Sequence, residues 1–389
     1  MSKLGTFLIH GFIAMALALA AVGISQDALA GAGSAQFAPD NDWRDTDGSP
    51  IDAHGGCILF HEGVYYWYGE EKTGRTFLPD CNKSWGGTRV DMAGVSCYSS
   101  TNLRDWKNEG LALPAIPDSP GDLNPGNVLE RPKVIYNRQS KQFVMWMHID
   151  SADYHEARLG VAVSENPAGP YKYRGSTRPD AGIWPINVTD ADKTPGEGNY
   201  LARDFKNGQM ARDMTAFVDD DGKAYIFYAS EENSTMHVSL LTDDYLKTTG
   251  KYSRILIGRS REAPAVFKHN GKYYLITSGS TAWDPNAAQS AVADSIFGPW
   301  TELGNPCIGP HADKTFSGQS AFVLPVSGNN SLIFIADRWN KWDLSNSSYL
   351  WLPLEFDGDA RPRVAWRDNW SLSVAKTAKV KHYVSSDPQ

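Results

Sequence analysis

The sequence predicts an all-β protein, a five-bladed β-propeller. Short runs of β-branched and aromatic residues alternate with turns rich in Gly, Asn and Asp, and no long helical period appears. One strand–turn–strand pattern also recurs five times along the chain, and a third strand follows most copies. Five similar sheets of three or four strands are typical of a propeller. A two-sheet sandwich, the structural alternative, would not require the copies to resemble one another.

Each copy consists of an apolar strand, a tight polar turn and a second strand rich in aromatic residues. The first copy has its apolar strand at 57–60 and its second strand at 64–68. The other four pairs are 133–136 with 143–147, 215–218 with 224–228, 265–267 with 273–276, and 321–324 with 332–335. Third strands are expected at 94–100, 160–164, 236–240, 290–293 and 349–352. Asn-Gly and Asp-Gly pairs in the turns are hairpin signals, and they support this register.

Residues 1–30 predict a secretory signal peptide. Lys3 is followed by the apolar run 7–24, which ends in a small-x-small cleavage pattern. An uncleaved membrane anchor is the alternative, but the polar stretch 31–39 favours cleavage. We therefore expect a secreted or periplasmic protein in which residues 31–389 form one catalytic propeller, without membrane contact after cleavage.

The net charge and the cysteine content further narrow the possible classes of protein. The formal net charge of −8 argues against nucleic-acid binding, because such proteins carry a basic footprint. We expect a monomer, and a chain of this length suits a propeller because each blade has its own core. The four cysteines fit no zinc pattern. A bridge between Cys81 and Cys97 and four buried free thiols are both compatible with the sequence.

Polar residues precede the first strand of every copy. In a propeller these strands line the central axis, so the residues just before them converge on one face. Several carboxylates there repel one another and lose solvation, which raises at least one pKa. A carboxyl that stays protonated can donate to a leaving-group oxygen while a polar group opposite holds water, as in inverting glycosidases. Caps at strand ends would explain any one residue, but not five in register. The residues are Asp52, His54, Glu130, Arg131, Arg212, Asp213, Arg261, Glu262 and Gln319.

Tryptophan supplies flat surfaces for the C–H faces of sugar rings. Trp67, Trp146 and Trp351 fall within strand patterns and are expected in the core. Four others lie in or beside loops and are candidates for sugar contact, although packing between blades would explain them equally well. They are Trp85, Trp283, Trp339 and Trp342.

Several stretches of this chain are long enough to compare with a known family. They are AHGG (53–56), YYWYGE (65–70), ERPKVIYN (130–137), RDMTAFVDDDGKAY (212–225), REAPAVFKHNGKYYLITS (261–278), GPW (298–300) and TFSGQSAFVLP (315–325). Together they resemble glycoside hydrolase family 43, and most of all its exo-β-1,3-galactanase branch. The similarity extends from about residue 50 to residue 370.

The resemblance implies an inverting exo-hydrolase. Glu262 matches the general acid, and Asp213 matches the carboxylate that orients the acid and tunes its pKa. Glu130 matches a substrate-binding carboxylate. Most of the family carries a general-base Asp at the start of blade one, whereas the galactanase branch is thought to use a Gln in its imidic form, and Gln319 occupies that place. Because Asp52 lies near the position of the usual base, the sequence leaves Gln319 and Asp52 as alternatives.

The remaining expectations concern the substrate. Long loops at 73–92 and 174–210 would reshape the sugar sites if they lie on the ligand face. We expect an oligo- or polysaccharide substrate with β-1,3-galactan linkages, and no required cofactor. A structural Ca²⁺ is compatible with the central channel, but no ligand cluster stands out. Further substrate-binding side chains are expected at His54, Asp52, Glu70, Asn233 and Trp283.

Three other functions compete with this one. An α-L-arabinofuranosidase or β-xylosidase would use the same scaffold, and pocket details that the sequence does not give would separate them. A non-catalytic sugar-binding propeller predicts loss of the acid, yet Glu262 and Asp213 are both present. A sialidase would need Asp-box repeats and an arginine cluster, and neither is clear in the sequence.

Overall fold

The computed structural model describes residues 34–39, 41–79, 87–358 and 360–373. The predicted signal peptide, Cys81 and Trp85 lie outside the described residues. The described part of the chain contains no helix that is long and apolar enough to cross a membrane.

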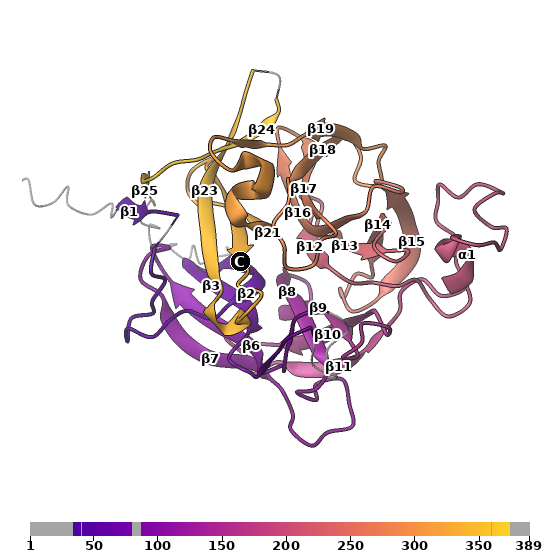
Figure 1. Cartoon of the computed structure of the whole chain (residues 1–389), viewed down its shortest axis with the longest axis horizontal. Coiled ribbons are helices and arrows are strands. Elements are labelled where there is room, and N and C mark those ends of the chain that lie inside the picture. The colour runs from indigo at the N-terminus through magenta and orange to yellow at the C-terminus, as the bar shows by residue number, and fades with distance from the viewer. Residues whose placement is uncertain (1–33, 40, 80–86, 359, 374–389) are drawn as a thin grey trace, which may run out of the picture.

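Five sheets surround one axis, which confirms the propeller (Figure 1). All their strand pairs are antiparallel except that of the two outermost strands of blade five. Blade one consists of β2 (His54–His61), β3 (Val64–Glu71), β6 (Gly94–Ser100) and β7 (Lys107–Pro114). Blade two consists of β8 (Val128–Asn137), β9 (Gln142–Asp150), β10 (Arg158–Ser164) and β11 (Lys172–Thr177). Blade three consists of β12 (Met214–Val218), β13 (Ala224–Ser230), β14 (Thr235–Leu241) and β15 (Thr248–Ile255).

Blades four and five complete the ring. Blade four consists of β16 (Arg261–His269), β17 (Lys272–Gly279), β18 (Gln289–Ala293) and β19 (Thr301–Gly304). Blade five consists of β21 (Gln319–Pro325), β22 (Leu332–Arg338), β23 (Ser348–Phe356), β24 (Pro362–Ala365) and β20 (Cys307–Ile308). The first strand of each blade is the innermost, and these strands contact one another in turn until β21 meets β2. The repeat seen in the sequence is therefore the blade.

The two ends of the described chain lie side by side. The strand β1 (Ser34–Phe37) pairs antiparallel with β25 (Trp370–Ser373), as the neighbouring labels in Figure 1 show. The ring of Phe37 stacks on that of Trp370 with 4.4 Å between ring centroids. This contact fastens the first and last described strands to each other next to blade five.

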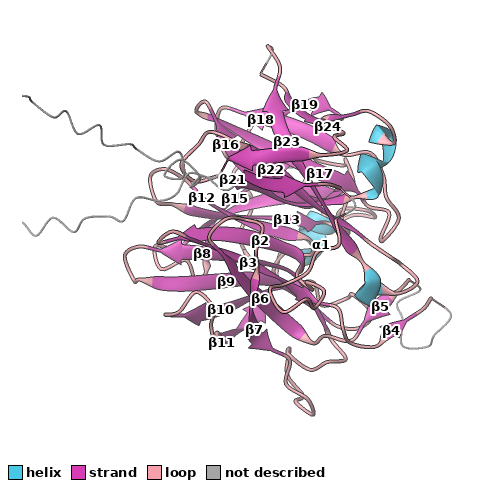
Figure 2. Cartoon of the chain, turned by 90° about the vertical axis from the view of Figure 1, so that its left-hand side faces the viewer, coloured by secondary structure: helices cyan, strands magenta, loops and turns pink. Residues whose placement is uncertain are grey.

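The predicted core tryptophans are buried. Trp67 and Trp351 belong to one aromatic cluster with Trp43 and Trp106, and Trp146 is buried between blades two and three. Buried side chains of this kind form apolar clusters that join neighbouring blades. Figure 2 shows the stacked sheets from the side.

The structure shows whether three of the four cysteines are free or bridged. Cys57, Cys97 and Cys307 are free, buried thiols. The expected bridge from Cys81 to Cys97 was therefore wrong, because Cys97 packs as a small apolar residue between the blade-one and blade-two strands.

Three inner strands have a β-bulge near their first residues, directly after polar residues predicted from the sequence. The register of β2, β8 and β16 shifts just after His54, Glu130 and Glu262. In each case the next residue has a positive φ, 59° at Gly55, 55° at Arg131 and 52° at Ala263. A bulge adds one unpaired residue and turns the strand, so the side chain before it can point towards the axis.

Two long connections between strands contain further short elements outside the five blades. The first, expected at 73–92, contains the short pair β4 (Thr76–Phe77) and β5 (Arg89–Val90). The second was expected at 174–210 but starts at residue 178, because β11 continues to Thr177 as a largely exposed edge strand. It carries the single α-helix assigned among the described residues, α1 (Tyr200–Asp204).

Candidate active site

A cavity of about 590 Å³ opens where the inner strands begin. Side chains from all five blades line it, among them Glu70, Glu130, Arg131, Asp213, Asn233, Glu262, Gln319 and two tryptophans. Seven of the nine residues predicted to act or bind substrate, Trp283 among them, therefore meet in one place. The exceptions are Asp52 and His54, which do not line it.

Glu262 is a buried carboxyl group on the cavity wall. Its side chain extends from the β16 bulge, and the residue is 7% exposed. Burial, reinforced by the charge of Asp213, raises the pKa of Glu262 to about 8 against the opposing effect of Arg131. Glu262 is therefore protonated near neutral pH and can give a proton to an oxygen atom.

Asp213 holds the backbone next to Glu262. Its Oδ2 atom accepts a hydrogen bond of 3.1 Å from the backbone N–H of Ala263. The same oxygen lies 3.1 Å from the guanidinium of Arg131. Asp213 thus fixes the bulge that carries Glu262 and also supplies the negative charge that keeps Glu262 protonated.

Gln319 connects the acid to the opposite wall of the cavity. Its Nε2 atom donates to Oε1 of Glu262 and to Oγ of Ser278, both over 3.0 Å. Its Oε1 atom accepts hydrogen bonds from Arg131 over 2.5 Å and from the indole N–H of Trp339 over 2.8 Å. Groups of the protein therefore occupy every hydrogen-bonding direction of this amide.

Glu130 is an ionised carboxylate on the same face. Burial raises the pKa of Glu130, but hydrogen bonding to His148 and the charge of Lys72 outweigh it and lower the pKa to about 2. The Tyr154 hydroxyl donates to Oε1 of Glu130 over 2.7 Å, and Nδ1 of His148 lies 3.3 Å from Oε2. This fixed acceptor is suited to binding sugar hydroxyl groups.

Glu70 lies beneath Glu130 at the cavity floor. One carboxylate oxygen accepts the backbone N–H of Arg131 over 2.8 Å, and the other pairs with the buried ammonium group of Lys72. A Cβ atom at Gly55 would sit 2.2 Å from Oε1 of Glu70, so only glycine fits there.

Asp52 lies outside the cavity. Both of its carboxylate oxygens accept the backbone N–H of Lys72 over 3.0 Å, and Oδ1 lies 3.4 Å from Nε2 of His54. The ring of His54 is itself 1% exposed and lies between Asp52 and Asp337. These two residues therefore support the floor and have no open path to a sugar in the cavity.

The loop tryptophans divide into two groups. Trp283 and Trp339 line the cavity and pack edge to face, 4.9 Å between ring centroids. The ammonium group of Lys72 lies 5.2 Å from the Trp283 ring and 5.4 Å from the Trp339 ring, which orients both indoles. Trp342 is 68% exposed and does not line the cavity.

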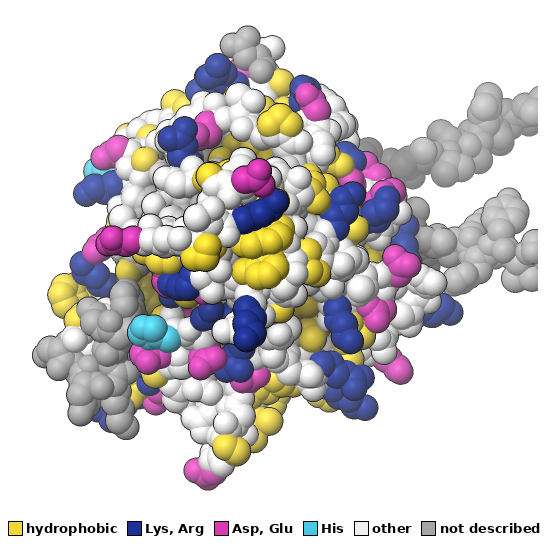
Figure 3. All heavy atoms as spheres, turned by 90° about the vertical axis from the view of Figure 1, so that its right-hand side faces the viewer, with side chains coloured by type: hydrophobic (Ala, Val, Ile, Leu, Met, Phe, Trp, Pro, Cys, Tyr) yellow, Lys and Arg dark blue, Asp and Glu magenta, His cyan; other side chains and the backbone are white. Residues whose placement is uncertain are grey.

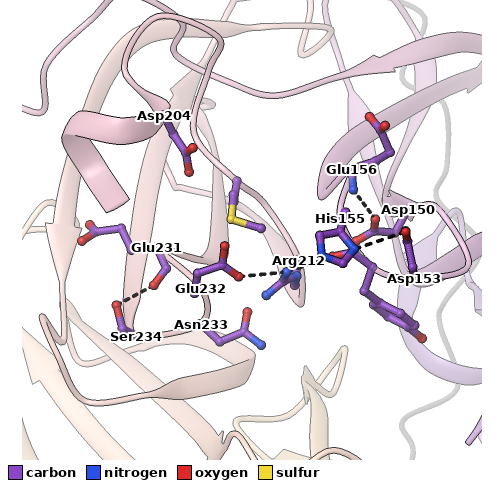
Figure 4. Close-up of polar contacts among 12 residues, drawn as sticks. Asp150, Asp153, His155, Glu156, Asp204, Arg212, Glu231, Glu232, Asn233 and Ser234 are labelled. Carbon is purple, nitrogen blue, oxygen red and sulfur yellow. Dashed lines mark hydrogen bonds and ion pairs between the residues drawn. The ribbon is translucent and has the colours of Figure 1, made fainter. Parts of the chain in front are cut away.

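A turn of blade three contributes Asn233. Three consecutive residues, Glu231, Glu232 and Asn233, have positive φ values of 50°, 55° and 61°. The left-handed conformation costs residues with side chains roughly 1–2 kcal/mol each, so other contacts must hold this turn. Nδ2 of Asn233 lies 3.5 Å from Oε2 of Glu262. Figure 4 shows the turn facing Arg212 and the 150–156 loop of blade two.

Sequence reasoning missed several members of the site. Tyr154 and His148 hold Glu130, and Lys72 holds Glu70, but all three lie away from the starts of the inner strands. The repeat pattern carries no signal for them, because it aligns only corresponding positions of the blades. The indication available for Lys72 was its place directly after Glu70 and Glu71, at the end of β3.

One group among the described residues has the atoms to hold a metal ion. Single ligand atoms of Glu130, His148 and Asp213 lie within 4.8 Å of one another. However, Nε2 of His148 is 2.9 Å from Asp150, and Arg131 already neutralises Asp213. The guanidinium of Arg131 would repel a divalent cation at this position.

Comparison with known proteins places the chain in a family. The sequence profile of glycosyl hydrolases family 43 matches residues 58–359. No curated protein sequence matched the chain. Among solved structures, a family 43 β-1,3-galactosidase bound to galactodeoxynojirimycin is 45% identical, with a TM-score of 0.79 over 86% of this chain and 99% of that one.

Two exo-β-1,3-galactanases are also similar. The enzyme from Phanerochaete chrysosporium, solved with galactose, is 35% identical, with a TM-score of 0.72 over 87% of this chain and 69% of that one. The enzyme from Clostridium thermocellum is 34% identical, with a TM-score of 0.72 over 88% of this chain and 67% of that one. The profile match, these identities and the carboxylate-lined axial cavity all indicate the same family. The chain therefore belongs to family 43 of the glycosyl hydrolases and is a glycosidase.

Proposed function

We propose that this protein is an inverting exo-β-1,3-galactosidase that removes galactose from the ends of β-1,3-galactan chains. The observation that carries the proposal is Glu262, a carboxyl group held protonated in the axial cavity by burial and by Asp213. The sugar is suggested by three similar proteins named as β-1,3-galactosidase or exo-β-1,3-galactanases.

Each cavity residue has a proposed role. Glu262 donates its proton to the glycosidic oxygen as the bond to the anomeric carbon breaks. A water molecule attacks that carbon from the opposite face, and its proton passes to Gln319 acting in the imidic form. Glu130, with Tyr154, binds sugar hydroxyl groups. These reaction steps invert the anomeric configuration, because the anomeric carbon undergoes a single displacement.

Gln319 is favoured over Asp52 as the group that activates water. Gln319 lines the cavity, whereas Asp52 lies behind it with both oxygens bound to the Lys72 backbone. Oε1 of Gln319 accepts hydrogen bonds from Arg131 and Trp339, which hold the amide in place at the cavity wall.

Product analysis tests the proposal. Purified protein is incubated with β-1,3-galactan, arabinogalactan and arabinan, and the first products are followed by NMR. We expect galactose released as the α-anomer from β-linked chains. Release of the β-anomer would contradict inversion, and release of arabinose or xylose alone would replace the proposed substrate by that of the alternative pentosidases.

We also propose that the protein is exported and acts as a monomer. The basis for export is the sequence of residues 1–30, with its early Lys3 and apolar run. N-terminal sequencing of protein from the host's secreted or periplasmic fraction should begin near residue 31. Light scattering during size-exclusion chromatography should give the mass of one chain.

A further inference from the structure

The long connection between blades two and three has a specific place in the structure. We call residues 178–209 the α1 segment, after the helix that it carries. It lies on the face of the molecule shown in Figure 3, where basic, acidic and hydrophobic side chains are interspersed. Its inner side is next to the turn formed by residues 231–233, as Figure 4 shows for Asp204 and Glu231.

The 231–233 turn is both strained and close to the chemistry. All three of its residues have positive φ. The last of them, Asn233, lines the cavity and approaches Glu262 with 3.5 Å between Nδ2 and Oε2. Strained segments of this kind persist only where the surrounding structure holds them, and they are concentrated at functional sites.

The α1 segment holds the first residue of the turn through a buried arginine. Glu231 is 5% exposed, and its two oxygens accept hydrogen bonds of 2.7 and 2.8 Å from Arg254. The remaining amine of Arg254 pairs with Asp192 of the α1 segment over 2.7 Å. The side chain of Asn187, also in the segment, bonds to both the backbone N–H and the backbone C=O of Arg254.

A second contact reaches the middle residue of the turn. Arg203, on α1, donates to Oε1 of Glu232 over 2.9 Å and is itself oriented by two bonds to Asp204. The other oxygen of Glu232 accepts from Arg212 over 3.2 Å. Arg212 also donates to the backbone C=O of Tyr154, so the turn is linked to the loop that holds Glu130.

We propose that the α1 segment is a positioning device, which through Asp192 and Arg203 holds the 231–233 turn and so places Asn233 beside the acid Glu262. Arg203 contacts Glu232 directly, and Asp192 acts on Glu231 through Arg254, so the segment supports two adjacent residues of the turn. The third residue is thereby aimed into the cavity. This inference rests on the proposed role of Glu262 as the acid.

The contacts indicate which kinetic parameter should change. The side chain of Arg203 is 44% exposed and that of Glu232 is 36% exposed, so their pair adds little to folding stability. The position of Asn233 relative to the acid is sensitive to a small shift of the turn. Loosening the turn should therefore lower kcat and leave the unfolding temperature nearly unchanged.

The experiment combines two substitutions in the segment with one in the turn. Arg203→Met and Asp192→Asn are made singly and together, each in the wild-type chain and in the Asn233→Ala chain. In the wild-type chain we expect the double substitution to lower kcat roughly fivefold, equivalent to about 1 kcal/mol, with KM nearly unchanged. In the Asn233→Ala chain the same pair should have no further effect. Arg259→Met, which breaks a surface pair with Glu302 on blade four, is the matched control and should leave kcat unchanged.

The outcome separates this inference from the proposed function. Kinetics are measured on a glycan that the wild type hydrolyses, because its leaving group depends on protonation by the acid. An equal loss of kcat with and without Asn233 would overturn the positioning role, because the effect would not pass through that side chain. An unchanged kcat in the double variant would overturn it as well. Wild-type activity on an arabinoside but no galactoside would contradict the proposed substrate and leave this test fully usable.

Discussion

Gln319 and Glu262 are joined directly: Nε2 of the amide donates to Oε1 of the carboxyl group over 3.0 Å. In inverting enzymes that use two carboxyl groups, about 6.5–9.5 Å between them leaves room for the water nucleophile. Gln319 and Glu262 therefore lie closer together than the two carboxyl groups of such an enzyme. We expect a bound sugar ring to break this hydrogen bond, so that a water molecule can lie beside Gln319.

Replacing the acid should abolish most activity on natural substrates. Glu262→Gln keeps the size of the side chain but has no proton to give, so kcat on β-1,3-galactan should fall roughly 10²–10⁴-fold. Aryl galactosides with good leaving groups should lose much less, because they need little protonation. Steady-state kinetics on both substrates checks this, with circular dichroism as the control for folding. Equal losses on both substrates would contradict the role of Glu262 as the acid.

The pH profile should report the environment of Glu262. Burial and Asp213 raise the pKa of Glu262 to about 8, and the acid works in its protonated form. Wild-type kcat/KM should therefore decline as pH increases through about 8. In Asp213→Asn the negative neighbour is lost, the pKa of Glu262 falls, and this decline should move to lower pH. A profile whose basic limb stays in place in Asp213→Asn would show that another group titrates there.

Comparing two variants should identify the residue that activates water. Gln319→Ala should lower kcat by about 10²-fold or more without a large change in stability. Asp52→Ala leaves the buried N–H of Lys72 without its acceptor, so it should instead lower the free energy of unfolding by about 1–3 kcal/mol. The measurements are kcat and urea unfolding of both variants. The reverse pattern, with kcat lost only in Asp52→Ala, would transfer the role to Asp52.

Chelation should leave activity intact. The cluster of Glu130, His148 and Asp213 includes a carboxylate that Arg131 already neutralises, so a divalent cation would be repelled. We expect the same kcat after dialysis against EDTA, with and without added Ca²⁺, measured on an aryl galactoside. A loss of activity that Ca²⁺ restores would assign a metal to the central channel.

The repeat explains why much of the fold could be predicted. Inner strands such as 57–60 and 265–267 are apolar on both faces and are followed by Asn-Gly or similar turns, so local sequence specifies them. Outer strands such as β7, β11 and β15 are half exposed and rich in polar residues. The pairing of these outer strands depends on the neighbouring strand, and no periodic pattern in the sequence predicted them. For the same reason the boundary at residue 177 was misplaced.

The sequence by itself determined the number of blades and the positions that face the axis, because both follow from a local pattern repeated five times. It thereby indicated Glu130, Asp213, Glu262 and Gln319 as neighbours. Only the tertiary structure decided that Asp52 lies behind the cavity and that Tyr154 holds Glu130. It also decided that the α1 segment supports the turn carrying Asn233. These contacts join residues that are distant in sequence, and the direction of each side chain depends on bulges and turns that form only when the blades pack together.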